Sequence, residues 1–190
     1  MINGIDYLKK MYPNRDDKDY QPSGLDLRLG KVYHIDEYKN GMFLGLYGGK
    51  KYLPNHIEAR ERKVTIMTES GEEEYIGWDL KPHVPYICEV QEQIKIGENN
   101  AQFYLPRSTL LRAGINVYTA LGDLGYNGHL SFLVINHGKN SFFIEKGERF
   151  AQLVDFEVRG GSESYNGDYQ EKEVIAFYDN YWENLPSSED

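Results

Sequence analysis

The stretch TALGDLGYNG, residues 119–128, is a glycine-rich turn between two apolar runs, and it constrains the fold more than any other part of the chain. Glycines placed between two β-rich segments are typical of a hairpin. The turn carries one carboxylate, Asp123, where a hairpin can present a reactive side chain to a ligand. The stretch KGERFAQL, residues 146–153, follows about twenty residues later and predicts a second turn that leads into a strand.

Short β-rich segments separated by Gly, Pro and Asn fill most of the chain on both sides of this turn. In the last of them the apolar Val154 and Phe156 alternate with Asp155, which predicts a half-buried strand with its apolar residues inward. Their spacing predicts an all-β barrel or sandwich. We expect strands at Leu25–Val32, Lys63–Met67, Tyr86–Gln91, Gln102–Leu105, His129–Ile135, Ser141–Ile144 and Ala151–Val158.

Three further segments have patterns of their own. Asn3 is expected to cap a short helix that ends before Pro13. The charge-dense range Arg60–Trp78 predicts a solvated hairpin or loop, with an acidic interaction site as the alternative. The run Leu130–Ile135 is apolar on both faces, which indicates burial between layers or against another chain and so hints at an oligomer.

The bulk properties bound the class of protein. A chain of 190 residues can bury a core without disulfides, and we expect one domain over residues 1–172 with a C-terminal extension at 173–190. The net charge of -9 disfavours nucleic acid as a partner. The lone Cys88 predicts a buried thiol and a reducing compartment. The N-terminal sequence does not resemble a leader and no apolar run approaches the ~18 residues of a membrane span, so we expect a cytoplasmic protein that does not bind membranes.

Arg107, Ser108 and Thr109 follow an apolar segment that ends at Pro106, so they stand where a strand passes into a turn or a helix. Backbone N–H groups, a hydroxyl and a guanidinium that converge there would suit a polyphosphate. A helix-capping serine and a surface arginine would explain the same residues, and this stretch alone does not decide between the two interpretations.

Asp123 and Tyr126 lie three residues apart between glycines, so the carboxylate could orient a water molecule and the ring could face a sugar. The alternative is an aspartate that bonds its own backbone beside a tyrosine that covers the hairpin. Gln152 follows the next glycine turn, and its amide can bond phosphate oxygens. The five histidines form no i,i+4 pair and have no cysteine partner, so no zinc site is predicted.

Four segments, taken in order, resemble the motifs of the superfamily of dUTP diphosphatases and dCTP deaminases. The resemblance covers roughly residues 22–169 and implies a distorted antiparallel β-barrel of the jelly-roll type, the dUTPase-like β-clip, with little helix. It also implies a homotrimer whose sites are shared between subunits. The segments are PSGLDLRLG at residues 22–30, PRSTLL at 106–111, ALGDLGYNG at 120–128 and GERFAQL at 147–153.

The resemblance implies hydrolysis of dUTP to dUMP and pyrophosphate, with Asp123 activating the attacking water. Asp26 is then structural, Tyr126 lies under the deoxyribose and excludes a 2′-hydroxyl, and Mg²⁺ is held mainly by substrate phosphates and water. The tail RGGSESYNGDYQ lacks the usual phenylalanine that stacks on uracil, and two tyrosines are the candidates to replace it. The implied substrate-binding residues are Arg107, Ser108, Thr109, Arg112, Tyr126, Gln152, Tyr165 and Tyr169.

Two other functions stay open. Deamination of dCTP needs a proton-shuttling glutamate ten residues after Asp123, where this chain has Leu133, and leucine cannot move protons. A non-catalytic or regulatory nucleotide binder is the other alternative, because Asp168 occupies the position of a phosphate-binding lysine in the deaminases' tail and would repel a triphosphate. The base that the site prefers is not decided by these residues.

Overall fold

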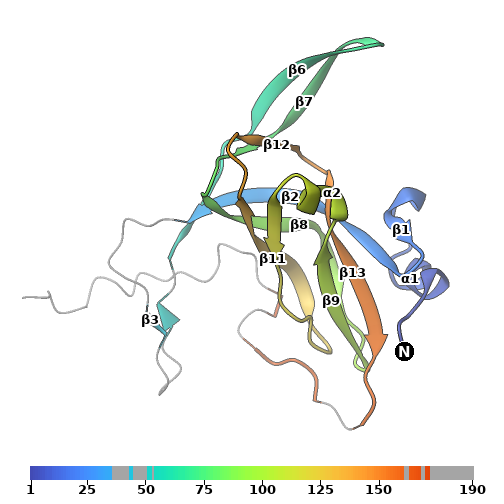
Figure 1. The fold of residues 1–190 in the computed structure, drawn as a ribbon. Coiled ribbons are helices and arrows are strands. Elements are labelled where there is room, and N and C mark those ends of the chain that lie inside the picture. Colours follow the sequence, from blue (N-terminus) through green and yellow to red (C-terminus); the bar gives the residue numbers. More distant parts are fainter. Residues whose placement is uncertain (36–42, 45–50, 53, 161–162, 168–169, 172–190) are drawn as a thin grey trace, which may run out of the picture.

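The computed structural model describes residues 1–35, 43–44, 51–52, 54–160, 163–167 and 170–171 (Figure 1). The expected C-terminal extension at 173–190, together with Asp168 and Tyr169, lies outside these ranges. The described part consists mainly of β-strands with two short α-helices and one 3-10 helix, as the sequence predicts. None of these helices is long and apolar enough to cross a membrane.

Every strand expected from the sequence is present. The strands that form the main sheet are β1 (Tyr20–Gln21), β2 (Gly24–Ile35), β5 (His56–Glu58), β8 (Pro85–Lys95), β9 (Asn100–Pro106), β10 (Ile115–Tyr118), β11 (Asn127–Asn136) and β13 (Arg149–Glu157). The remaining strands are β3 (Phe43–Leu44), β4 (Lys51–Tyr52), β6 (Arg62–Thr68), β7 (Gly71–Leu80) and β12 (Phe142–Glu145).

The main sheet is antiparallel and eight-stranded, and its central order is β10-β11-β8-β2-β13-β9. Its two outer strands approach each other, because the Thr119 hydroxyl just after β10 donates to the Tyr104 carbonyl in β9 at 2.7 Å. Gly122 also pairs with Gln102 of β9 in an isolated bridge. The sheet is therefore nearly closed into a barrel, which confirms the predicted fold class (Figure 1).

The core lies inside this barrel. Leu25, Leu27 and Leu29 of β2 alternate with polar residues, and all three are fully buried. Leu153 of β13 is opposite Leu25 and Tyr104 of β9 is opposite Leu153, so the three face the same side of the sheet. The predicted burial of the Cys88 thiol is also confirmed.

The predicted inner face of β13 is wrong. Leu153 and Asp155 face inward, whereas Val154 and Phe156 are half-buried on the outer side. The Asp155 carboxylate is buried because amide groups from Asn3, Asn100 and Gln102 donate hydrogen bonds to it at 2.6, 2.6 and 2.9 Å. Buried carboxylates with such donors keep their hydrogen bonds and so avoid most of the cost of burial.

The N-terminal helix α1 (Ile5–Met11) is present, but Asn3 does not cap it. Gly4 is the N-cap residue, and it has no side chain with which to cap the helix. The Asn3 side chain instead bonds Asp155, and its backbone N–H donates to the Asp155 carbonyl at 2.9 Å. Asn3 therefore attaches the N-terminus to the end of β13 and does not cap the helix.

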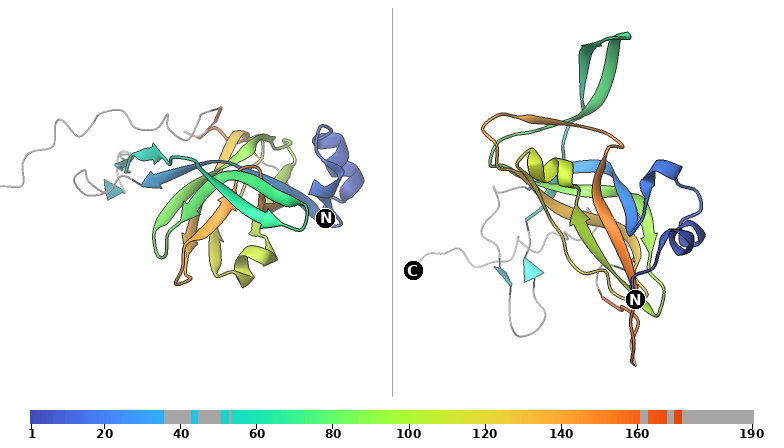
Figure 2. Two further views of the ribbon diagram at one scale, coloured as in Figure 1. Left: turned by 90° about the horizontal axis from the view of Figure 1, so that it is seen from above. Right: turned by 45° about the vertical axis from the view of Figure 1, so that its right-hand side comes forward.

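β6 and β7 form the solvated hairpin expected within Arg60–Trp78, and it stands away from the barrel (Figures 1 and 2). Its base is attached through β12, which pairs with the end of β7 from Gly77 to Leu80. Trp78 is buried there, and its indole N–H donates to the Ala59 carbonyl at 3.1 Å. The hairpin is thus an exposed arm with a buried anchor.

Candidate functional site

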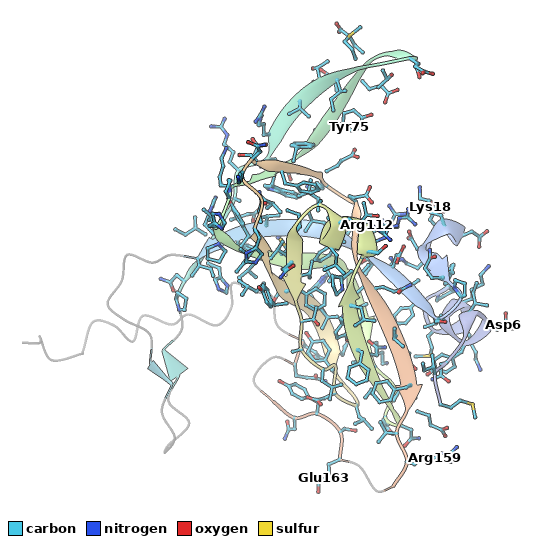
Figure 3. All side chains as sticks on the ribbon, in the orientation of Figure 1. Asp6, Lys18, Tyr75, Arg112, Arg159 and Glu163 are labelled. Atoms are coloured by element: carbon cyan, nitrogen blue, oxygen red, sulfur yellow. The ribbon has the colours of Figure 1, made fainter. Side chains whose placement is uncertain are left out.

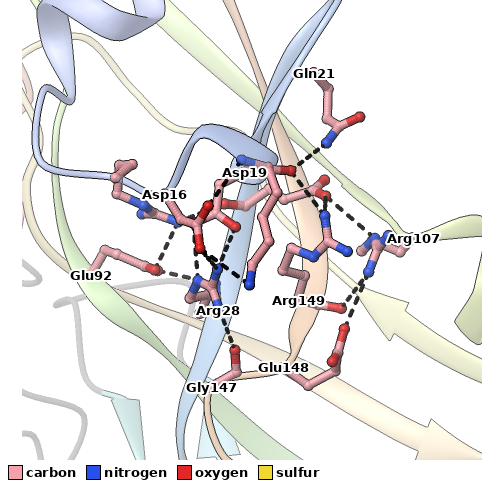
Figure 4. A network of polar contacts seen from close by, with 12 residues as sticks. Asp16, Asp19, Gln21, Arg28, Glu92, Arg107, Gly147, Glu148 and Arg149 are labelled. Carbon is pink, nitrogen blue, oxygen red and sulfur yellow. Dashed lines mark hydrogen bonds and ion pairs between the residues drawn. The ribbon is translucent and has the colours of Figure 1, made fainter.

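Asp26 is buried on β2 under two arginines that come from other parts of the chain. The Arg107 Nε and the Arg149 Nη1 lie 3.5 and 3.3 Å from the Asp26 Oδ2. Arg149 therefore pairs with an internal carboxylate. Figure 4 shows Arg107 and Arg149 beside each other, with Glu148 next to Arg107.

Burial and the neighbouring arginines have opposite effects on the pKa of Asp26. Burial raises the pKa of Asp26, while Arg107 and Arg149 act in the opposite direction. Arg107 also reaches Glu148, whose Oε1 lies 3.3 Å from Nη1. The Arg107 guanidinium therefore holds one buried and one exposed carboxylate, and the exposed one is the partner that an incoming anion could replace.

Gln152 lies next to Asp26 on the outer face, because the two residues are in register across β13 and β2. Its amide makes no hydrogen bond with any residue in the described ranges. A Cβ at Gly24 would lie only 3.0 Å from the Gln152 Cγ, so the glycine makes room for this side chain. The arrangement leaves the amide of Gln152 free to bind a ligand beside the arginines.

Ser108, Thr109 and Arg112 lie on the short helix α2 (Ser108–Arg112), which begins where β9 ends. The N-cap residue is Arg107 and not Ser108, so the simple interpretation of Ser108 as a helix-capping serine is wrong. Arg112 Nη1 donates to the Ser108 Oγ at 3.0 Å, and both side chains are exposed. The structure therefore brings the predicted phosphate-binding residues Arg107, Ser108, Thr109, Arg112 and Gln152 to one end of β9.

Asp123 lies on the loop between β10 and β11, and its side chain is exposed. Its carboxylate has no hydrogen-bonding or ionic partner among the residues that the structure describes. The alternative in which the aspartate bonds its own backbone is therefore not observed. The backbone around it is firmly held: Gly122 exchanges two hydrogen bonds with Gln102 at 2.8 and 2.9 Å, and the Ile96 N–H donates to the Tyr126 carbonyl at 2.8 Å.

Tyr126 is buried beside the same loop and its hydroxyl donates to the His129 carbonyl at 3.0 Å. Burial, and to a smaller extent the nearby Tyr165, raises the pKa of Tyr126 to about 12, so the hydroxyl stays protonated and keeps this bond at neutral pH. Tyr165 contacts the Tyr126 ring edge-on at 5.8 Å, and its N–H donates to the Leu124 carbonyl at 2.6 Å. The first of the two tail tyrosines thus lies against the Asp123 loop.

The two groups of predicted site residues lie at opposite ends of β9 within one chain. The Asp123 loop joins β9 at Gln102, whereas Arg107 follows the other end of the strand. Five residues of extended strand span ~17 Å, which is too far for one small group to contact both. Figure 3 shows Arg112 near one end of the barrel, and Arg159 and Glu163 at the other.

Two of the hollows on the described surface lie beside the arginine cluster. A cleft of about 250 Å³ beside Arg107 and Thr109 is mostly apolar and lies under the exposed arm, with Tyr75 and Phe142 in its wall. A wider groove of about 1020 Å³ lies over the charge network drawn in Figure 4, with Arg28 and Glu92 in its wall. Asp123 is not among the residues that line these two hollows.

The sequence did not identify the glycines that shape these positions. Gly24 leaves space for Gln152, and Gly122 lets the Asp123 loop approach β9. Both glycines stand inside the motif segments, which was the available signal. The position expected for a deaminase glutamate is Leu133 on β11, opposite Tyr118 of β10. No group of three or more His, Cys, Asp or Glu in the described ranges is placed to hold a metal ion.

Comparisons with known proteins identify the family of this chain. The sequence profile described as dCTP deaminase-like matches residues 6–158. The chain is 37% identical to the probable deoxyuridine 5'-triphosphate nucleotidohydrolase of Methanopyrus kandleri, with 89% of this chain and 99% of that protein covered. It is 39% identical to the protein of the same name from Methanothermobacter thermautotrophicus, with 90% of this chain and 100% of that protein covered.

Among solved structures, the 2'-deoxycytidine 5'-triphosphate deaminase of Agrobacterium tumefaciens superimposes with a TM-score of 0.58 at 17% identity. The match covers 81% of this chain and 47% of that one, and it supports the barrel fold. The profile match spans most of the chain, and both archaeal relatives align over nearly their whole length. The chain therefore belongs to the dUTP diphosphatase and dCTP deaminase superfamily.

Proposed function

We infer that the protein is a dUTP diphosphatase, which hydrolyses dUTP to dUMP and pyrophosphate. The observation that carries this inference is the Asp123 carboxylate, which is exposed on a firmly held loop and has no partner in the described ranges. The archaeal relatives named deoxyuridine 5'-triphosphate nucleotidohydrolases support the same reaction. Leu133 argues against deamination, because an aliphatic side chain cannot transfer a proton.

Asp123 orients and deprotonates a water molecule for in-line attack at the α-phosphorus. The phosphates are bound at the other group of residues, where the Gln152 amide is free and Arg107 can exchange Glu148 for a phosphate oxygen. Ser108, Thr109 and Arg112 extend this surface along α2. Such a reaction depends mainly on positioning and on neutralising the charge of the leaving pyrophosphate.

Tyr126 packs against the deoxyribose. Because its hydroxyl already donates to the His129 carbonyl, the ring is the part that contacts the sugar. In this proposal the ring packs against the sugar and leaves no room for a 2′-hydroxyl. Tyr165 packs on its edge and helps to close the base pocket, a role that we also assign to Tyr169, which is outside the described ranges. Base preference itself depends on backbone groups of the loop.

Mg²⁺ fits these residues as a cofactor that the substrate carries. The Asp26 carboxylate is held by two arginines and is not free to bind a cation. Mg²⁺ keeps several waters and commonly binds substrate phosphates through few protein ligands. When it is bound, it neutralises charge on the phosphate oxygens, while Arg107 and Gln152 orient the phosphate chain.

The site requires a second copy of the chain, because Asp123 and Arg107 lie at opposite ends of β9. The outer face of that strand is apolar, with Phe103 and Leu105 about half exposed and Phe103 stacked on Phe156 at 4.9 Å. Exposed apolar residues on a sheet face favour burial against another chain. A homotrimer with three shared sites, which the family resemblance implies, accounts for both features.

The test is the substitution Asp123→Asn, assayed by pyrophosphate release from dUTP with Mg²⁺. The variant keeps the shape of the side chain but loses the base, so kcat should fall by about 10³-fold while a non-hydrolysable dUTP analogue binds within about 3-fold of the parent affinity. Asp6→Asn, which changes an exposed aspartate on α1, is the matched control and should turn over at the parent rate. Equal rates for Asp123→Asn and the parent chain would refute the role of Asp123.

The same assay separates the other functions. Binding of deoxynucleotides to the parent chain without release of pyrophosphate would identify a non-catalytic binder. Release of ammonia from dCTP would identify a deaminase and would require another group to replace Leu133 in proton transfer. A panel of dUTP, dCTP and dTTP and their ribose forms also measures the preference for the base and the sugar.

A further inference from the structure

The loop that carries Asp123 meets β9 through its neighbour Gly122. The Gly122 N–H donates to the Gln102 carbonyl at 2.8 Å, and the Gln102 N–H donates to the Gly122 carbonyl at 2.9 Å. Three residues earlier, the Thr119 hydroxyl donates to the Tyr104 carbonyl at 2.7 Å. The position of Asp123 therefore depends on how closely Gly122 approaches the strand, because consecutive Cα atoms are separated by a fixed ~3.8 Å.

Gly122 is needed for this approach and not for its backbone angles, since its φ is not in the left-handed region. A Cβ placed on it would come within 3.0 Å of the Tyr104 hydroxyl oxygen and 2.7 Å from the Ile96 Cδ1. Real Cβ atoms do not make such contacts, so a side chain here would push the loop or the tyrosine away. The Tyr104 hydroxyl and the Ile96 Cδ1 thus occupy the space in which any other residue at 122 would have a side chain.

The Tyr104 hydroxyl is fixed by a buried chain of hydrogen bonds. It donates to the Gln102 Oε1 at 2.9 Å, and the Gln102 Nε2 donates to the Asp155 Oδ2 at 2.9 Å and to the Tyr12 hydroxyl at 3.0 Å. Tyr104, Gln102 and Asp155 are only 3%, 1% and 2% exposed. Burial raises the pKa of Tyr104, so its hydroxyl remains a donor to Gln102 over the working range of an enzyme.

We propose that Tyr104 is a positioning residue for Asp123: its hydroxyl, held by Gln102 and Asp155, limits how closely the Gly122 backbone can approach the strand. We call this hydroxyl the stop. Tyr104 does not touch the substrate in this scheme. It acts through the backbone of the loop and sets the distance between the attacking water and the α-phosphorus. The proposal rests on the proposed function, because it assigns Tyr104 to the loop that carries the catalytic aspartate.

A firm stop is useful because displacement of a catalytic group by about 1 Å can cost about 100-fold in rate. Other contacts of the loop involve residues that follow Asp123: the Gly125 N–H donates to the Gly97 carbonyl at 3.4 Å, and the Leu124 carbonyl accepts from the Tyr165 N–H. Gly122 is the residue directly before Asp123, so a displacement of the Gly122 backbone also displaces the Asp123 carboxylate. The Asp155 network also connects this stop to Asn3, next to the N-terminal helix.

The experiment combines Gly122→Ala and Tyr104→Phe, alone and together, in the dUTP assay. Gly122→Ala should lower kcat by about 100-fold with KM changed by less than about 3-fold, because the loop moves but the phosphate-binding end does not. Tyr104→Phe leaves the loop without its stop and should lower kcat by about 10-fold. In the double variant the hydroxyl no longer blocks the added methyl, and the Ile96 Cδ1, the end of a flexible side chain, can turn aside. The kcat should therefore rise by about 10-fold over Gly122→Ala, which is the coupling expected for groups in contact.

Two controls separate positioning from general damage. Tyr86→Phe removes another buried tyrosine hydroxyl, which bonds the Lys81 N–H at 3.0 Å, and it should keep the parent kcat even if its unfolding midpoint falls. Gly4→Ala adds a methyl group where nothing lies within 4 Å, and it should also keep the parent kcat. Unfolding midpoints of all variants show whether the loss of rate follows the loss of stability.

Two results would overturn the proposal: a parent-like kcat for Tyr104→Phe, or a double variant no faster than Gly122→Ala alone. If Asp123→Asn is inactive while Gly122→Ala and Tyr104→Phe turn over normally, the diphosphatase function stands and the positioning role fails. If the parent chain itself releases no pyrophosphate, the proposed function fails first. Tyr104→Phe keeps the test decisive if Gly122→Ala does not fold.

Discussion

Asp26 combines almost complete burial with two arginine partners, and the balance between these effects fixes its ionisation. Burial has the larger effect and raises the pKa of Asp26 above its ordinary 3.8, although Arg107 and Arg149 lower it. The folded chain then holds this proton to a higher pH than the unfolded chain does. Between 3.8 and the raised value, the contribution of Asp26 to the free energy of unfolding falls as the pH rises.

Asp26→Asn removes this titration. Because the parent loses the contribution with rising pH and the variant cannot, the stability of the variant relative to the parent should increase as the pH rises from 3.8 through the raised pKa of Asp26 and level off above it. Urea unfolding of both chains at several pH values measures the difference. A difference that is independent of pH would contradict the raised pKa of Asp26.

At the scale of elements, local patterns located the strands but not all of their faces. The strands could be predicted because turn residues and alternating apolar residues are local features of the sequence. Asp155 faces inward because Asn3, Asn100 and Gln102 supply amide donors from distant parts of the chain. The polarity pattern of the strand could not reveal those partners. Because the Asn3 side chain bonds Asp155, it does not cap the helix as predicted.

Shortening the arm formed by β6 and β7 tests whether the barrel depends on the arm for its stability. Residues 67–72 form its tip, and replacing them by Asn-Gly keeps the pair Ile66 and Glu73 and suits a two-residue turn. Because this tip is mostly exposed, the trimmed chain should lose less than about 1 kcal/mol of stability and keep the parent turnover.

The contrasting variant is Trp78→Ala at the buried anchor of the arm. It should cost about 3–5 kcal/mol, because it empties a core position and removes the indole bond to the Ala59 carbonyl. Chemical unfolding monitored by circular dichroism compares the two variants. A larger loss from trimming the tip than from Trp78→Ala would show that the arm is part of the core.

At the scale of the whole molecule, the central feature is the separation of the two groups of site residues. The motifs gave both groups from the sequence, because each is a short local pattern. Their separation along β9 could not be read from the motifs, since it depends on which strands close the barrel. A single chain offers Asp123 at one end and Arg107 at the other, so the proposed function requires that copies of the chain meet.

The most direct measurement of this account mixes two inactive chains, one with Asp123→Asn and one with Arg107→Ala. The two are unfolded together in urea, refolded as mixed assemblies and assayed for pyrophosphate release from dUTP, with each variant refolded alone as the control. If each site takes Asp123 from one copy and Arg107 from another, random mixing should restore about a quarter of the parent rate. If the mixture stays as inactive as either variant alone, although mixed assemblies have formed, the shared site is contradicted.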